Sequence, residues 1–483
     1  MRQKTKLHGF NLSRRGIRCS SQANKKMKIL FITQPFIIEP LGIMYLSAQL
    51  KKAKHKTDLI TTKEDYIRKI EEWKPDLIAY SVITGSQHDY FKLNNEIKEK
   101  FPKILTFMGG PFITFSPETI KKENIDIICI GEGEEAITEL ANKLEKKQAI
   151  TKIKNLWVKK KGRIYKNPLR PYIKNLDEIE FPDREIIYKY EEQRDNPIKH
   201  FIATRGCPYK CTYCFNHQYH DLYKGQPLVR YRSPDNLIKE IKETIEKYPT
   251  KFIYFQDDTI ILDKKWVEEF CDKYKKEINM PFHCHIRANL LTEETARVLK
   301  KANCYSVHVA IEAGNQKTRN ELLNRQMTNE EIIQTCKLLR KYQIKFMTQN
   351  IIGIPTEKLK DAMQTLKLNI TCKPTYAWVS IFQPYPGTKM EEFVKKHNLL
   401  EEDTDKIEKK FFDKSIIKLK DKKKIEHLQK LFGLTVDNPI IYKTGLLKLL
   451  INLPNNKLIK NFYKQIYKSH RKRADHKLFG LKL

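Results

Sequence analysis

Short apolar runs alternate with amphipathic segments over most of the chain. Between residues 27 and 150 the apolar runs lie at 29–32, 57–60, 77–82, 104–108 and 127–130. Helical patterns, such as 43–53 and 91–100, separate them. Short buried strands with intervening helices are typical of a parallel, doubly wound sheet with helices on both faces. We therefore predict an α/β fold that begins with a Rossmann-like domain over residues 27–150.

The same alternation returns after a connector, residues 151–195, that contains a predicted hairpin at 155–165. Further strand patterns lie at 200–204, 252–255, 282–286, 307–312, 346–352 and 378–382. Six strand–helix units predict a partial (β/α)6 barrel of the TIM type over residues 196–390. In such barrels the chemistry lies at the carboxyl ends of the strands.

The two ends of the chain have different patterns. Residues 1–26 are basic and polar, so we expect a disordered extension. Met1 and Met27 are the two candidate sites at which translation starts. A transit peptide is the alternative, because this segment carries Arg and Ser and lacks acids. Residues 391–483 predict a helical C-terminal region. Its apolar stripe, flanked by Lys and Arg, favours packing on the barrel, with peripheral membrane contact as the alternative.

Composition narrows the class of protein. A length of 483 residues suggests two or three domains, and 40% hydrophobic residues suffice for real cores. We find no apolar stretch long enough to span a bilayer and no signal-peptide core, so we expect a cytoplasmic protein. The 92 Lys and Arg exceed the 58 acids, a formal charge of +34. Because the lysines are spread along the chain, this charge argues only weakly for nucleic acid or anionic lipid.

Three of the ten cysteines stand apart from the rest. Cys207, Cys211 and Cys214 lie within eight residues, directly after the first predicted barrel strand. Three soft sulfur ligands at this spacing indicate an iron–sulfur cluster or zinc. A zinc site completed by His217 or His220 is the alternative. The other cysteines occur singly, and we expect small buried hydrophobes at Cys19, Cys129, Cys271, Cys284, Cys304, Cys336 and Cys372.

The Cys-x3-Cys-x2-Cys spacing, with an aromatic residue before the last Cys, resembles that of the radical S-adenosylmethionine (SAM) superfamily. The resemblance implies a [4Fe-4S] cluster whose open iron binds SAM, with cleavage to a 5′-deoxyadenosyl radical and an electron donor such as flavodoxin or ferredoxin. Segments after the later strands are similar to the family's strand ends, although Ala313 stands where Ser is usual. By this resemblance the SAM-binding residues are Tyr213, Asp258, Arg287, Glu312 and Gln383.

The first domain carries small residues after its predicted strands, where doubly wound sheets bind ligands. Together with the cysteine motif they resemble the cobalamin-binding radical SAM class, over about residues 27–390. The resemblance implies cobalamin contacts at Ser81, Thr84, Gly109, Gly110, Gly131 and Gly133. The chain has no Asp-x-His-x-x-Gly string to supply a cobalt ligand, and His55 and His88 are the nearest candidates, each better explained as an ordinary histidine. A domain that binds no cobalamin is the alternative.

The class resemblance implies methylation of an unactivated carbon in a small-molecule or lipid-like metabolite. A cobalamin-dependent radical oxidation or cyclisation, as in tetrapyrrole ring formation, is the alternative within the class. An RNA-modifying radical SAM enzyme is a further alternative, although nucleic acid is not the partner we favour. Beyond the cluster ligands, the sequence predicts no catalytic residue.

Overall fold

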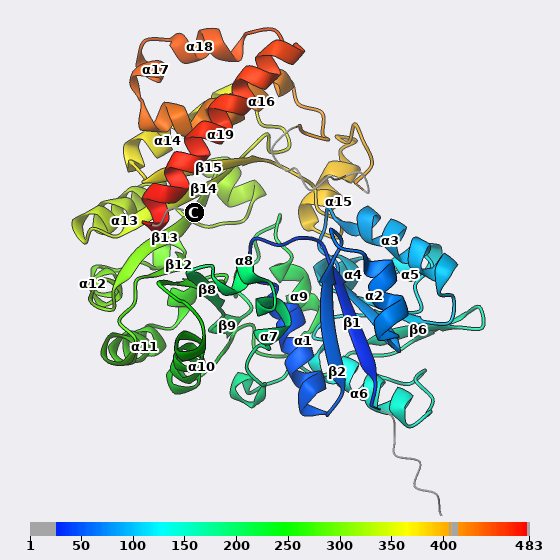
Figure 1. Ribbon diagram of the computed structural model, residues 1–483. Helices are drawn as coiled ribbons and strands as arrows, with labels where there is room; N and C mark the ends of the chain where they lie inside the picture. The colour runs from blue at the N-terminus through cyan, green and yellow to red at the C-terminus, as the bar shows by residue number, and fades with distance from the viewer. Residues whose placement is uncertain (1–25, 405–406, 408–413, 481–483) are drawn as a thin grey trace, which may run out of the picture.

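The computed structural model describes residues 26–404, 407 and 414–480 (Figure 1). The predicted N-terminal extension, up to residue 25, and Cys19 lie outside this part of the chain. The α/β fold class is confirmed: a sheet domain is followed by an open barrel and then by C-terminal helices. The six isolated cysteines that are described are all buried and free, as expected.

The sheet domain is built on a seven-stranded sheet in the order β2-β1-β3-β4-β5-β6-β7. Its strands are β1 (Lys28–Thr33), β2 (Lys56–Thr61), β3 (Leu77–Ser81), β4 (Leu105–Gly109), β5 (Ile127–Cys129), β6 (Leu156–Lys160) and β7 (Arg163–Lys166). The first five are parallel, whereas β6 and β7 form an antiparallel hairpin that pairs with β5. The hairpin predicted within the connector therefore extends this sheet beyond residue 150.

Helices cover both faces of the first sheet, because its strands are apolar on both sides. Phe31 of β1 packs beneath α1 and α6, whereas its neighbours Leu30 and Ile32 pack beneath the helices of the other face. These helices are α1 (Leu41–Lys52), α2 (Tyr66–Trp73), α3 (Gln87–Lys100), α4 (Pro111–Phe115), α5 (Thr119–Lys122) and α6 (Glu134–Glu145). The strand order and the two covered faces leave the carboxyl edge of the sheet open for ligands.

Six parallel strands in sequence order form the barrel, which is open between β8 and β15. They are β8 (Ile198–Phe201), β11 (Phe252–Phe255), β12 (Phe282–Ile286), β13 (Cys304–Glu312), β14 (Lys345–Ile352) and β15 (Tyr376–Ile381). A short antiparallel pair, β9 (Thr204–Arg205) and β10 (Arg230–Tyr231), follows β8. The outer helices are α10 (Pro234–Lys247), α11 (Lys264–Glu277), α12 (Glu293–Lys301), α13 (Asn329–Lys341) and α14 (Leu359–Cys372).

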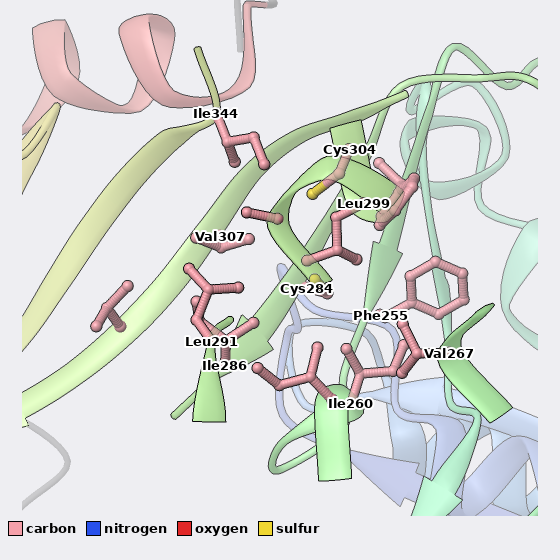
Figure 2. Close-up of a cluster of buried hydrophobic side chains, with 14 of the residues drawn as sticks. Phe255, Ile260, Val267, Cys284, Ile286, Leu291, Leu299, Cys304, Val307 and Ile344 are labelled. Atoms are coloured by element: carbon pink, nitrogen blue, oxygen red, sulfur yellow. The ribbon is translucent and has the colours of Figure 1, made fainter. Parts of the chain in front are cut away.

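The outer face of the barrel strands packs against these helices in one apolar core. Figure 2 shows Cys284 and Ile286 of β12 and Val307 of β13 within it, beneath Val267 of α11 and Leu299 of α12. Because side chains alternate along a strand, the residues between them must face the barrel interior. Strand β12 therefore sends every second side chain inward, toward the axis of the barrel.

The C-terminal region closes the amino-terminal end of the barrel. Helix α16 packs on β15 and α19 packs on α16. The carboxyl end of α19 lies beside β13 (Figure 1). Helix α19 ends with Phe479, whose ring contacts Phe252 and Tyr254 of β11. This region comprises α15 (Lys389–Lys396), α16 (Lys422–Asp437), α17 (Ile440–Lys443), α18 (Leu446–Ile451) and α19 (Lys457–Phe479). Over the described residues, no helix combines the length and the apolar character needed to cross a bilayer.

Three short helices complete the chain between the two sheets and around the cysteine loop. They are α7 (Glu185–Tyr188), α8 (Glu191–Arg194) and α9 (Asn216–Leu222). Helix α7 joins the domains through Arg184, whose guanidinium is buried between Glu39 of the sheet domain and Glu240 of α10, each at 2.9 Å. A buried Arg needs such carboxylate partners. Glu39 thus fixes the two domains against each other instead of facing a ligand.

Candidate active site

A cavity of about 480 Å³ lies between the carboxyl edge of the first sheet and the barrel, and we call it the sheet cavity. Five of the six small residues predicted to contact cobalamin line it, namely Ser81, Gly109, Gly110, Gly131 and Gly133. The sixth, Thr84, is buried and does not belong to the described lining. Apolar side chains such as Leu46 and Phe107 line the same cavity, so it offers backbone and apolar surface together.

Two of these glycines are required by the packing of the chain itself. Gly110 has φ +94°, and a Cβ there would lie 2.7 Å from the backbone N and O of Val82. Gly131 has φ +78°, and a Cβ there would overlap the Tyr223 hydroxyl. The sequence suggested that Gly109 and Gly110 let a ligand approach the backbone. The structure adds a second reason for Gly110, since only glycine tolerates this conformation and this contact.

The acids of the Gly131–Glu134 segment bind arginines of the barrel. Glu132 accepts hydrogen bonds from Arg230 at 2.7 and 3.1 Å and from Arg205 at 3.1 Å, and Glu134 accepts one from Arg205 at 2.6 Å. Burial opposes ionisation of Glu132, but hydrogen bonding to Arg230 and the charge of Arg205 give it a lowered pKa. These ion pairs therefore hold the Gly131–Glu134 segment, which lines the sheet cavity, against Arg205 and Arg230 of the barrel domain.

A second cavity, of about 270 Å³, lies at the carboxyl ends of the barrel strands, and we call it the cluster cavity. The three motif cysteines line it together with four of the five residues predicted to bind SAM: Tyr213, Asp258, Arg287 and Glu312. The fifth, Gln383, is not in the described lining. Its amide donates a 3.0 Å hydrogen bond to the carbonyl of Lys414.

The cysteine loop is shaped for a group larger than a single ion. Zinc bound by thiolates at about 2.3 Å would hold its sulfur atoms roughly 4 Å apart, yet among the described residues the sulfurs of Cys207, Cys211 and Cys214 do not all lie within 4.8 Å of one another. The two histidines of the zinc alternative contact carbonyl oxygens of the loop, His217 at 3.3 Å and His220 at 2.7 Å. They brace the loop, and the wide spacing of the sulfurs favours a cluster.

A positively charged group lies beside the thiols. Arg325 Nη1 is 3.8 Å and Arg287 Nη1 is 4.0 Å from the sulfur of Cys211. Burial raises the pKa of Cys207 to about 11 and that of Cys214 to about 12. Ionised thiolates at these positions therefore need cationic partners, and a bound metal deprotonates its thiol ligands.

Arg325 also organises the wall of the cluster cavity, although no sequence motif pointed to it. Its guanidinium donates hydrogen bonds to the Tyr213 hydroxyl at 2.6 Å and the Ala310 carbonyl at 2.8 Å. Tyr213 in turn donates to Glu312 at 2.9 Å. Glu312 sits at φ +67°, just after a register shift in β13, and burial raises its pKa. This left-handed backbone is costly for a non-glycine residue and turns the Glu312 carboxylate into the cavity.

The paired acids at the end of β11 have separate tasks. Asp257 is fully buried and accepts hydrogen bonds from the backbone amides of Ala203 and Thr204 and from the Thr204 hydroxyl. Asp258 lines both cavities, and Asn216 donates to it at 3.1 Å. Asn216 and Cys207 also line both cavities. The sheet cavity and the cluster cavity therefore share one wall.

Comparison with known proteins defines the class. The B12 binding domain family model matches residues 27–141, and the Radical SAM superfamily model matches residues 201–368. The chain belongs to the radical SAM enzymes that carry an N-terminal B12-binding domain.

Individual relatives support the same assignment. An uncharacterized methyltransferase of Pyrococcus horikoshii is 28% identical over 75% of this chain and 79% of its own length. An anaerobic magnesium-protoporphyrin IX monomethyl ester cyclase of Rubrivivax gelatinosus is 26% identical over 73% of this chain and 67% of its own length. The solved structure of the cobalamin-dependent SAM radical enzyme OxsB has the same fold, with a TM-score of 0.69 at 16% identity over 94% of this chain and 72% of that chain. An iron–sulfur cluster, SAM and cobalamin are therefore the cofactors of this enzyme.

The sheet cavity fits cobalamin without a histidine from the sheet domain. His55 lies 3.0 Å from the Asn142 side-chain oxygen and His88 packs edge-on against the Phe91 ring, and neither belongs to the described lining. His220 of the barrel does line the cavity, but its Nε2 is hydrogen-bonded to the Cys207 carbonyl. The side-chain amide of Gln256 also lines it, and its buried nitrogen has no partner among the described residues. That nitrogen is a free donor for a polar group of a bound cofactor.

Proposed function

We propose that this enzyme methylates an unactivated carbon of a small-molecule or lipid-like metabolite. The observation that supports this most directly is the wall shared by the two cavities, formed by Cys207, Asn216 and Asp258. A reaction that needs both SAM and cobalamin requires their sites to open on a common space, where a substrate can reach each.

The residues divide the work as follows. Cys207, Cys211 and Cys214 would hold a [4Fe-4S] cluster, with Arg287, Glu312 and Asp258 around the SAM beside it. When bound, the cluster and SAM supply a hydrogen-abstracting radical, and cobalamin supplies the methyl group. Arg287 stacks on Tyr209, with its guanidinium 3.6 Å from the ring centroid, so it is held rigid for a carboxylate of SAM. Ser81, Thr84 and the glycines Gly109, Gly110, Gly131 and Gly133 remain the predicted cobalamin contacts.

The test is the product pair formed by anaerobically reconstituted enzyme. With reductant and SAM, it should release 5′-deoxyadenosine, and it should release S-adenosylhomocysteine in step with methylation of its bound cobalamin. A Gly110→Ala enzyme without bound cobalamin should still form 5′-deoxyadenosine and lose S-adenosylhomocysteine. Deoxyadenosine alone from the fully loaded wild type would contradict methyl transfer.

The second candidate is a cobalamin-dependent oxidation or cyclisation. The similarity to the anaerobic cyclase favours it, because that relative covers 73% of this chain at nearly the same identity as the methyltransferase. Such a reaction would consume SAM to 5′-deoxyadenosine without forming S-adenosylhomocysteine. The product test above therefore separates the two candidates.

The C-terminal helices support a lipid-like substrate or a membrane surface as a partner. Leu449 of α18 is 70% exposed and Leu458 of α19 is 78% exposed, and lysines Lys448 and Lys457 adjoin them. Apolar side chains among lysines suit an anionic bilayer. We expect binding to vesicles that contain phosphatidylserine, weakened several-fold in the Leu449→Glu/Leu458→Glu variant and absent with pure phosphatidylcholine. Equal sedimentation of this variant and the wild type would contradict the proposal.

A further inference from the structure

Three histidines lie inside the barrel, between the cluster cavity and Phe479 at the end of helix α19. Cys284 and Ile286 of β12 pack in the outer core (Figure 2). His283 and His285 alternate with them along the strand, so the two histidines face inward. His308 of β13 lies opposite them in the register, paired with His285. One nitrogen from each ring can be chosen so that all three lie within 4.8 Å of one another.

We propose that His283, His285 and His308 bind one divalent first-row transition-metal ion, such as zinc, beneath the cluster cavity. No such site follows from the class to which the chain belongs, and the proposal does not depend on the methylation chemistry. The nearest pair of nitrogens, Nε2 of His285 and Nδ1 of His308, is 3.1 Å apart. Two imidazoles on one ion at about 2.0–2.1 Å would bring their nitrogens roughly 3 Å apart.

A buried nitrogen without a partner points to a missing ligand. Nε2 of His283 is buried and has no hydrogen-bond partner among the described residues. Each ring is more than nine-tenths buried, since His283 is 0% and His308 is 7% exposed. A buried polar atom that makes no hydrogen bond costs free energy, and a metal ion would satisfy it.

The outer contacts of the rings orient them as metal ligands usually are. Nδ1 of His283 lies 2.7 Å from the Ser306 hydroxyl, which leaves its Nε2 as the free lone pair. His285 hydrogen-bonds the backbone of Asp257. A ligating histidine commonly donates its second N–H to such a partner, which fixes the ring and its tautomer.

The protonation state also suits a metal. Burial lowers the pKa of His285 to about 4. Burial also lowers the pKa of His283 and His308 well below the usual range, and the neighbouring rings add to the effect on these two. All three are therefore neutral near pH 7, which is the form that binds metal ions. Tyr254, whose hydroxyl is 3.2 Å from Nε2 of His285, could complete the coordination.

The proposed ion would be reached from the cluster cavity. His285 and His308 line that cavity along with the motif cysteines, whereas Phe479 of α19 covers His283 from below. With three protein ligands, one coordination position would remain for water, for Tyr254 or for a group of the substrate. The site therefore has the form of an open three-histidine centre.

The experiment uses the untagged full-length enzyme loaded with its cluster and cobalamin, so that iron occupies the thiolates. The enzyme is incubated with zinc, freed of excess ion on a desalting column, and analysed for zinc by mass spectrometry and X-ray absorption. We expect about one retained zinc per chain with imidazole nitrogens in its first shell. No retained zinc, a sulfur-containing shell or a shell of oxygen alone would overturn the proposal.

Variants locate the ion. His283→Ala and His308→Ala should each lower zinc retention at least tenfold. His427→Ala is the matched control, because His427 is also buried with an unpartnered Nε2 but lies on α16. It should retain zinc like the wild type, and equal zinc in all three variants would refute the assignment. If a variant fails to fold, the X-ray absorption result on the wild type alone decides.

Discussion

The sheet cavity and the cluster cavity meet at one wall but are built from different groups. The sheet cavity is lined mainly by backbone at glycines and by apolar side chains, and its Glu132, Arg205 and Arg230 are paired with one another. The cluster cavity is lined by thiols and by charged side chains such as Arg287, Glu312 and Arg325. The shape of the sheet cavity depends on the absence of Cβ atoms at its glycines. The shape of the cluster cavity depends on polar and ionic contacts such as those of Arg325. We therefore expect added volume to disable one cavity and lost charge or sulfur to disable the other.

The largest effect should follow from removing one cysteine. Cys211→Ala would remove one of the three sulfur ligands that we propose, so reductive cleavage of SAM should fall to background, a loss of at least about 10³-fold. Cys211 does not line the sheet cavity, so cobalamin should bind as in the wild type. The measurements are 5′-deoxyadenosine release and bound cobalamin. Cys271→Ala is the control, because Cys271 lies in the apolar core. If the Cys211→Ala variant cleaved SAM as fast as the wild type, Cys211 would not be a cluster ligand.

Adding one methyl group to the sheet cavity should produce the opposite result. Gly110→Ala places a Cβ 2.7 Å from backbone atoms at positive φ, which we expect to cost about 2–4 kcal/mol and to reduce cobalamin binding. Gly162→Ala is the matched control, because Gly162 also has a positive φ, of +75°, but a Cβ there meets nothing within 4 Å and the residue does not line the sheet cavity. Thermal denaturation and cobalamin titration should separate the two variants. Equal behaviour of both would show that the glycine backbone does not shape this cavity.

A smaller effect is expected from changing the arginine beside the thiols. Arg325→Lys keeps the charge but cannot reach both the Tyr213 hydroxyl and the Ala310 carbonyl. Tyr213 and Glu312 should then be less well positioned, with about a tenfold lower kcat/KM for SAM cleavage. Iron content should stay at the wild-type level. Loss of iron in this variant would instead indicate that Arg325 stabilises the cysteine loop itself.

The smallest effect concerns the contact between the two domains. Glu132→Gln weakens the pairing with Arg205 and Arg230 and should cost about 1 kcal/mol. Because folding lowers the pKa of Glu132, its contribution is present above the ordinary value of 4.5 and is lost as the pH falls below it. Melting temperature measured from pH 7 to pH 3 should therefore drop less steeply in the variant. Parallel curves would contradict this role.

Local patterns in the sequence predicted most of the strands and singled out the three cysteines as candidate cluster ligands. Strands at 252–255 and 282–286 coincide with β11 and β12. The first is a continuous apolar run, whereas the second alternates apolar residues with His283 and His285. The predicted strand at 200–204 is divided after Phe201, since Thr204 pairs with β10 instead. The three cysteines were recognisable because they lie within eight residues on one loop.

Only the tertiary structure decided which side chains meet. Glu132 and Arg205 are 73 positions apart and Arg325 and Tyr213 are 112 apart, and nothing in local spacing pairs them. Asp257 and Asp258 are adjacent in the sequence, just after β11, but they have different surroundings. Asp257 is buried and bonds backbone amides, whereas Asp258 lines both cavities. The sequence alone did not distinguish them. The sequence determined which chemistry the chain carries, because ligand types and hydrophobic periods are local. The packing of two sheets determined where that chemistry is assembled, because it joins residues that are distant along the chain.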